Sequence, residues 1–214
     1  LTIDYGPYGW IEDYNPGWTP NTKDSTHRRY RFGNQPQIAA WNLARLFESL
    51  GPLVRNTDRL NEALDFYIST YDEQNDIMWA AKLGIGDFQE SDGDLVRELN
   101  LLLQKVETDM TIFFRELCTI PGPDSNHLAE AFYDSGTIPH EEWNEWLGKW
   151  WQRVGGKPER GVMLKNNPKY VLRNWMAQLA IDAAEKEDYS VCKDMFKVLK
   201  TPYEEHEEFE SEWY

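Results

Sequence analysis

The sequence predicts a mainly α-helical fold that begins with one short strand. Apolar residues recur at three- and four-residue spacing in several separate stretches after residue 35, which is the pattern of helices that bury one face. The apolar run Leu1–Ile3 instead leads into Asp4 and a nearby glycine, as the end of a strand does. Residues 5–35 are rich in Gly, Pro, Asn and Thr, and they predict a long ordered loop.

Prolines, glycines and capping residues mark where the helices begin and end. Pro36 suits the first turn of a core helix, and Gly51 and Gly84 end the first two helices. Asp92 is expected to cap the third helix, and Asn167 with Pro168 is expected to cap a later one. The expected helices lie, in chain order, at about residues 35–50, 57–83, 92–106, 109–118, 126–133, 143–154, 167–183 and 188–200.

The strongest helical pattern lies between Trp143 and Trp151. Trp143, Trp146, Leu147, Trp150 and Trp151 follow at positions i, i+3, i+4, i+7 and i+8, so four indoles share one face. We interpret this face as an aromatic core seam, because the chain has no basic groove of the kind that accompanies base stacking. The alternative is a platform that binds a partner.

Composition narrows the classes of function. With 22 basic and 37 acidic residues the chain has a net charge of -15, which argues against a general nucleic-acid binder. No apolar run is long enough to cross a bilayer and no signal peptide is recognisable, so we expect no membrane partner and a cytoplasmic protein. Cys118 and Cys192 are too far apart for a Cys-x-x-Cys site, and Cys118 is expected in the core.

Asp4-Tyr5-Gly6 is the candidate functional motif. The preceding apolar run and the following glycine allow a carboxylate to be held rigidly at the end of an extended segment. Such a carboxylate is the hard ligand that holds Mg²⁺ against nucleotide phosphates, and the aspartate of Asp-Phe-Gly has this role in protein kinases. The triplet alone does not distinguish a metal site from a strand that ends in a turn.

The residues around the triplet carry a resemblance to a known family. The string Leu1–Trp10 (Leu-Thr-Ile-Asp-Tyr-Gly-Pro-Tyr-Gly-Trp) resembles the corresponding string of the selenoprotein O family, whose members are protein-kinase-like enzymes. The segment Asn167–Asn174 is similar to the family's C-terminal signature. Further matches follow in the family's order at Asp13–Gly17, Arg29-Tyr30, Asn34-Gln35-Pro36 and Trp41-Asn42-Leu43.

The resemblance implies the C-terminal part of a protein-kinase-like fold, namely the lower C-lobe with a helical extension. Residues 1–35 would form the strand of the metal aspartate and an activation-like loop, and residues 36–120 the C-lobe helices. Residues 121–203 would form the helical extension, and residues 204–214 an acidic tail. We expect that tail to be frayed or disordered, because it is mostly glutamate.

The resemblance also implies an activity. Members of the family bind ATP in a reversed orientation and transfer AMP to Ser, Thr or Tyr hydroxyls of protein substrates, with Mg²⁺ or Mn²⁺ as the metal. Asp4 would bind the metal and contact the nucleotide. The base and the other catalytic residues would lie upstream, in a missing N-terminal half, so we expect the fragment alone to be inactive.

Other parts of the chain leave alternatives open. A non-catalytic helical scaffold or pseudokinase fragment could hold a protein partner through the Trp143–Trp151 face or through the acidic tail. The basic cluster His27–Arg31 could meet phosphate or an acidic partner, or it could anchor its own loop. Pro16–Pro20 lacks the cysteine that some family members use in a redox-controlled disulfide, so we expect that switch to be absent.

Overall fold

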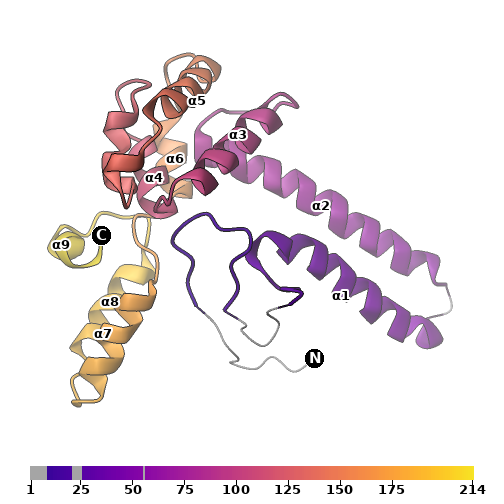
Figure 1. Ribbon diagram of the computed structural model, residues 1–214. Helices are drawn as coiled ribbons and strands as arrows, with labels where there is room; N and C mark the ends of the chain where they lie inside the picture. Colours follow the sequence, from indigo (N-terminus) through magenta and orange to yellow (C-terminus); the bar gives the residue numbers. More distant parts are fainter. Residues whose placement is uncertain (1–8, 21–25, 55) are drawn as a thin grey trace. The chain divides into compact units, whose positions relative to one another are not determined.

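The computed structural model describes residues 9–20, 26–54 and 56–214 (Figure 1). The chain divides into two compact units: Gly9 and residues 15–77 belong to the first, and residues 10–14 and 78–214 belong to the second. The strand expected at Leu1–Ile3 lies outside the described residues. None of the described helices combines the length and the apolar character needed to span a bilayer.

The first unit consists of a loop and helical segments, as expected. It contains η2 (Phe32–Asn34), α1 (Gln35–Leu50), η3 (Gly51–Leu53) and the greater part of α2 (Asp58–Leu83). In the loop, Phe32 N donates to Trp18 O over 2.8 Å, and the Arg29 guanidinium lies 4.3 Å from the ring centre of Trp41. The expectation that α1 is a core helix is wrong in this unit, because Ile38 is its one buried residue and Trp41 is 42% exposed.

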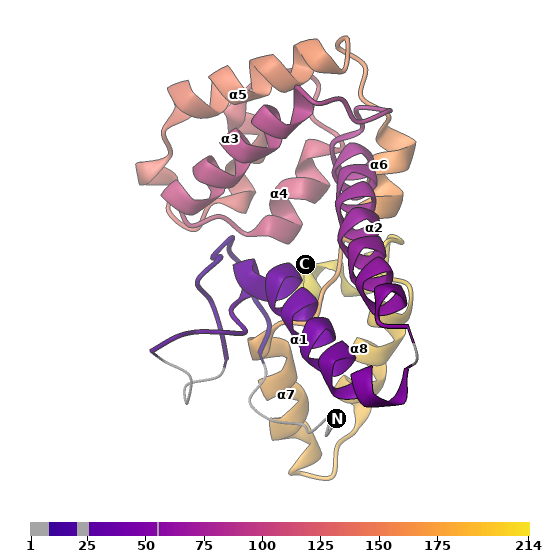
Figure 2. The ribbon, with the colours of Figure 1, turned by 90° about the vertical axis from the view of Figure 1, so that its right-hand side faces the viewer.

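The second unit is built from short helices around an aromatic core. The helices α3 and α5 lie side by side in both views, and α7 and α8 form a hairpin (Figures 1 and 2). The helical segments after α2 are α3 (Asp92–Lys105), α4 (Met110–Leu117), η4 (Ser125–Ala131), η5 (Ser135–Thr137), α5 (His140–Arg153), α6 (Arg160–Asn166), α7 (Asn174–Ala184), α8 (Ser190–Lys200), η6 (Glu207–Phe209) and α9 (Glu210–Trp213).

The tryptophans of α5 form the core of this unit. Trp143, Trp146 and Trp150 are at most 1% exposed, and the rings of Trp146 and Trp150 stack with their centres 6.3 Å apart. Trp146 Nε1 donates to Leu95 O over 2.9 Å, and Trp150 Nε1 donates to Leu83 O over 2.8 Å, so these indoles also tie α5 to α3 and α2. The core-seam interpretation is confirmed, because Trp143, Trp146, Leu147 and Trp150 are buried and the half-buried Trp151 packs against the same core, which argues against a partner-binding platform on this face.

A second, smaller core holds the C-terminal end of the chain. Its buried residues are Tyr170, Met176, Val198 and Trp213, and Trp213 is 2% exposed. The expectation that residues 204–214 are frayed or disordered is therefore wrong. The glutamates of this segment made it resemble a disordered tail, but its aromatic residues have a core to enter.

The expectation that the segment Asn167–Arg173 is helical is also wrong, because α7 begins only at Asn174. Asn167, Lys169 and Arg173 are all buried and bind groups on other elements. The sequence pattern also did not predict the short helix α6.

The expectation that Asp92 caps α3 is wrong, because Ser91 occupies the N-cap position and Asp92 is the first residue of the helix. Its carboxylate accepts a hydrogen bond from Gln89 N over 2.8 Å and pairs with Arg153 of α5, at 2.7 Å from Nε. Asp92 is 2% exposed, so this ion pair joins two helices inside the unit.

Gly84 directly follows α2 and lies against residues at the start of α6. Its φ of 62° lies in the left-handed region, and a Cβ on it would lie 2.7 Å from Met163 Sδ and 3.0 Å from Glu159 N. We expect Gly84→Ala to lower the free energy of unfolding by about 1–3 kcal/mol, measured by urea unfolding, because both the backbone and the neighbouring residues oppose a methyl group. Gly148→Ala in α5 is the matched control, since no atom lies within 4 Å of its added Cβ. Equal losses in the two variants would contradict this account.

Candidate functional site

The described part of the chain begins five residues after the candidate metal ligand. Asp4 lies among residues 1–8, outside the described residues, so its place in the structure stays a prediction. Residues 10–14, which comprise the last residue of its string and the four after it, belong to the second unit. The candidate site is therefore the framework that holds residues 10–13, and this framework is built largely from Asn167–Asn174, which we call the signature segment.

Asn174 binds the backbone of Trp10 on both sides. Trp10 N donates to Asn174 Oδ1 over 3.3 Å, and Asn174 Nδ2 donates to Trp10 O over 2.9 Å. The side-chain amide thus satisfies one backbone donor and one backbone acceptor, as a neighbouring strand would. Asn174 thereby fixes the backbone six residues after Asp4.

Arg173 binds the same segment through its charge. Its guanidinium is buried, forms an ion pair with Asp109, and lies 3.0 Å from Glu12 Oε2 (from Nη1). Burial opposes the charge of Arg173, but hydrogen bonds to Asp109 and Glu12 outweigh it and raise the pKa of Arg173. The Tyr133 hydroxyl donates to Glu12 and to Asp109, each over 3.2 Å. Glu12 Oε2 and Asp109 Oδ2 thus share the same two donors, Arg173 and Tyr133.

Asp109 links this ion pair to the backbone around it. Its Oδ1 accepts a hydrogen bond from Ile112 N over 2.9 Å, so the same carboxylate caps α4 and pairs with Arg173. Asp109 also forms an isolated β-bridge with Asp13, and Met110 N donates to Glu12 O over 2.9 Å. Residues 12 and 13 are therefore held by backbone and side-chain contacts together.

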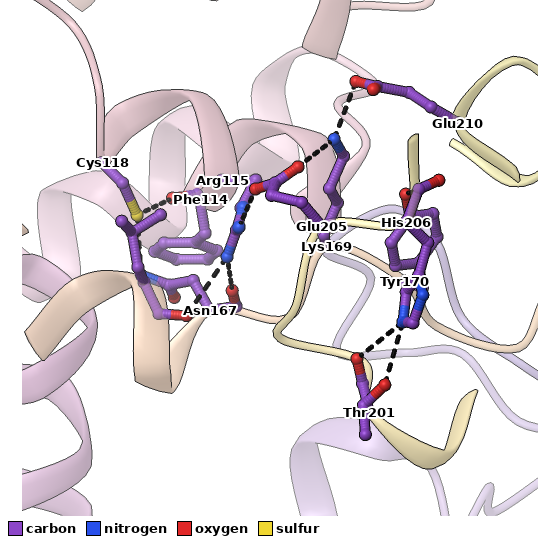
Figure 3. A network of polar contacts seen from close by, with 11 residues as sticks. Phe114, Arg115, Cys118, Asn167, Lys169, Tyr170, Thr201, Glu205, His206 and Glu210 are labelled. Atoms are coloured by element: carbon purple, nitrogen blue, oxygen red, sulfur yellow. Dashed lines mark hydrogen bonds and ion pairs between the residues drawn. The ribbon is translucent and has the colours of Figure 1, made fainter. Parts of the chain in front are cut away.

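A second ion network lies toward the other end of the signature segment (Figure 3). Arg115, near the end of α4, donates to the carbonyls of Leu164 and Asn167 and binds Glu205 Oε1 at 2.5 Å. Lys169 Nζ lies 2.5 Å from Glu205 Oε2 and 2.7 Å from Glu210 Oε1. The hydrogen bond from Lys169 lowers the pKa of Glu205, and burial opposes that shift less strongly.

Asn167 is a further fixed point of the segment, and it is fully buried. Lys82 Nζ donates to Asn167 Oδ1 over 2.8 Å, and Asn167 Nδ2 donates to Lys82 O over 2.9 Å. Burial lowers the pKa of Lys82 to about 8, and its ammonium lies 4.1 Å from the ring centre of Phe114. Burial raises the pKa of Cys118, which lies 3.5 Å from Asn167 Nδ2. Cys118 is confirmed as a core residue.

The framework holds residues 10–13, and its described residues do not themselves resemble a metal or nucleotide site. No group of three or more His, Cys, Asp or Glu side chains among the described residues could hold a metal ion. A pocket of about 250 Å³ between α3 and α5 has a charged rim, but Lys149 pairs there with Glu98 at 2.9 Å and with Glu145 at 3.0 Å. Of the residues that the sequence pointed to for function, Trp146 lines this pocket, and it is a buried core residue.

Sequence reasoning recognised the signature segment by its resemblance but did not predict what it binds. Arg173, Glu12 and Asp109 are far apart in sequence, so no local pattern indicates their contact. The one available signal was the pair of basic residues Lys169 and Arg173 in a stretch that also contains apolar residues, because buried cations require carboxylate partners. Of the basic cluster His27–Arg31, Arg28 donates to Gly17 O over 3.3 Å, as a loop anchor would.

Comparisons with known proteins agree with the two strings in the sequence. A family described as "Protein adenylyltransferase SelO" matches residues 1–200. A "Protein nucleotidyltransferase YdiU" of Aromatoleum aromaticum is 45% identical over 96% of this chain and 41% of its own length. Proteins of the same name are 43% identical in Flavobacterium johnsoniae, over 100% of this chain and 43% of the relative, and 42% identical in Rhodopirellula baltica, over 96% and 42%. The chain thus spans about two-fifths of the length of these curated relatives.

We expect Arg173→Met to lower the free energy of unfolding by about 3–5 kcal/mol, because it leaves the carboxylate of Asp109 buried without its cation. Lys105→Met, which removes one half of the exposed Lys105–Glu142 pair, should cost at most about 1 kcal/mol. Urea unfolding measures both. Adding Asp109→Asn to Arg173→Met should recover part of the loss, since an asparagine still caps α4 and carries no charge. Equal losses of unfolding free energy in Arg173→Met and Lys105→Met would contradict this account.

Glu116 of α4 makes the stability of this unit dependent on pH. Its Oε2 atom is buried without a hydrogen-bond partner among the described residues, and burial, with the charge of Glu130, raises the pKa of Glu116 to about 7. The unfolded chain releases this proton near pH 4.3, whereas the folded chain keeps it until about pH 7. The charge penalty therefore accumulates as pH rises through this window.

Glu116→Gln should raise the free energy of unfolding by about 1–3 kcal/mol at pH 8 and change it little at pH 4, because only the charged form is penalised. Urea unfolding at the two pH values measures the difference, with Glu90→Gln at an exposed position as the control. A gain of the same size at both pH values would show that the charge of Glu116 is not its cause.

Proposed function

The chain belongs to the SelO family of protein adenylyltransferases, and on that premise we propose that the whole protein transfers AMP from Mg-ATP to Ser, Thr or Tyr hydroxyls of protein substrates. A hydroxyl oxygen of the substrate forms a bond to the α-phosphorus, the bond from that phosphorus to the bridging oxygen of the β-phosphate breaks, and pyrophosphate leaves. The hydroxyl proton passes to a base that the family resemblance places outside residues 1–214.

In this proposal Asp4 binds the metal, and the framework described above holds residues 10–13, which come after it in the chain. A carboxylate is a hard oxygen ligand of the kind that Mg²⁺ and Mn²⁺ prefer, which fits the donor chemistry of this position. Bound at the phosphates, the metal ion would neutralise charge on the nucleotide and on the leaving pyrophosphate. By the family resemblance, the other ligands would come from the part of the protein outside this chain.

The observation that most supports this role is the attachment of residues 10–13. Asn174 holds the backbone of Trp10, and Arg173 with Asp109 holds Glu12, so the chain is fixed within six to eight residues of Asp4. A metal ligand contributes most to catalysis when its position is set before the nucleotide binds. The two strings that carry the family resemblance, Leu1–Trp10 and Asn167–Asn174, are thus physically joined at Trp10 and Asn174.

The protein-kinase-like fold belongs to the same proposal. The described chain is mainly helical, as the lower C-lobe of a kinase would be, and residues 1–35 would supply the metal strand and an activation-like loop. The non-catalytic scaffold, in contrast, loses one of its two expected binding surfaces, and part of the other is used inside the chain. The face Trp143–Trp151 is largely core, and two glutamates of residues 204–214 are bound to Lys169.

A transfer assay on the full-length protein tests the proposal. ATP labelled at the α-phosphate should transfer its label to a protein substrate, and ATP labelled at the γ-phosphate should not. Asp4→Asn should reduce the α-label transfer by about 10²-fold or more, because it removes the charge that holds the metal. Asp94→Asn, at an exposed carboxylate of α3, is the control that should keep full transfer. Transfer of the γ-label would identify a kinase instead, and no transfer of either label would favour a scaffold.

A further inference from the structure

The C-terminal segment supplies the carboxylates for two buried cations. Lys169 and Arg115 have side chains that are 6% and 8% exposed, whereas their partners Glu205 and Glu210 are 58% and 50% exposed. We call residues 204–214 the C-terminal clasp. We propose that Glu205 and Glu210 are positioning residues that hold the signature segment and, through it, the backbone at Trp10 and Glu12. The consequence for Asp4 rests on the proposed function.

The ion pairs of Lys169 and Arg115 with Glu205 and Glu210 couple the position of the clasp to that of the signature segment. Among the described residues, Glu205 is the carboxylate that pairs with Arg115, and Glu205 and Glu210 are those that pair with Lys169. A buried cation without its partner is strongly unfavourable, so release of the clasp would force Lys169 and Arg115 toward solvent. Lys169 lies in the signature segment, and its movement would displace that segment.

The signature segment and α4 form two parallel connections between the clasp and residues 10–13. Asp109 and Arg115 lie at opposite ends of α4, and each binds the signature segment: Asp109 binds Arg173, and Arg115 binds the carbonyl of Asn167. The clasp contacts Arg115 and Lys169, while Arg173 contacts Glu12. An ion pair lost at the clasp thus loosens both connections at one end.

Aromatic packing gives the clasp a second contact, next to Asn174. Trp213 is buried and stacks on Trp175 with the ring centres 6.0 Å apart and an angle of 19° between the planes. Trp175 adjoins Asn174, the residue that binds both backbone groups of Trp10. The Tyr214 ring also lies 4.8 Å from Lys169 Nζ. The clasp therefore holds the signature segment at Lys169 and immediately beyond its end at Trp175.

Amide hydrogen exchange on the 214-residue chain tests this coupling without nucleotide. Two reporter amides lie outside the clasp: Trp10 N is bonded to Asn174 Oδ1, and Met110 N is bonded to Glu12 O. In the double variant Glu205→Gln/Glu210→Gln, exchange at both reporters should rise by about tenfold or more, because their protection depends on the framework that the clasp holds. Amides of α5 should keep their protection, which shows that the variant remains folded.

Glu208→Gln is the matched control. Glu208 lies in the same clasp but pairs with the exposed Lys197, at 2.8 Å, so its loss should leave both reporter amides unchanged. If the double variant fails to fold, Glu210→Gln alone keeps Glu205 on both cations and should give a smaller rise at the same amides. The proposal is overturned if exchange rises only within the clasp and at Lys169 and Tyr170 while Trp10 and Met110 stay protected.

A kinetic measurement on the full-length protein separates positioning from simple loss of stability. The double variant should raise the KM for Mg-ATP by several-fold at a temperature where it is folded, while Glu208→Gln should not. An unchanged KM would overturn the positioning role. The exchange experiment does not involve Asp4 or nucleotide, so its failure is distinct from a failure of the proposed transfer reaction.

Discussion

The buried ion pair between Arg173 and Asp109 is the interaction on which the rest of the framework depends. Neither charge could remain buried alone, so the pair brings together the signature segment and the start of α4, 64 residues apart in sequence. Glu12 and Tyr133 complete the cluster, and through Glu12 it includes the segment that follows Asp4. A single charge requirement thus holds three distant parts of the chain in one arrangement.

The aromatic core and the ion networks have different roles in this unit. The indoles of α5 supply buried apolar area and two hydrogen bonds to carbonyls, which fix α5 against α2 and α3. The charged residues then set how non-helical segments attach to that core, because ion pairs and amide hydrogen bonds are directional while apolar burial is not. Residues 10–13 and Asn167–Arg173 are such segments. Their positions are specified by polar contacts.

The helices could be predicted from local pattern, and the framework could not. The expected bounds of α1 and α2 agree closely with the structure, because Pro36, Gly51 and Gly84 are strong local signals. Asn167-Pro168 carries the same kind of signal, yet the helix begins at Asn174, since three side chains of the segment bind partners on other elements. Residues 204–214 look disordered by composition, but Trp213 enters a core that also contains Tyr170, Met176 and Val198. In both cases the deciding contacts join residues far apart in sequence, where periodicity carries no information.

The framework gives a physical reason for the two most recognisable strings of this SelO-family chain. The first carries the candidate metal ligand, and the second binds Trp10 at the end of the first and Glu12 just beyond it, so each would be of little use without the other. A structure of the full-length protein with Mg²⁺ and a non-reactive ATP analogue tests this account most directly. It should place a carboxylate oxygen of Asp4 about 2.0–2.1 Å from the metal ion, with Asn174 on the Trp10 backbone. A metal ion held at the phosphates with no contact to Asp4 would contradict it.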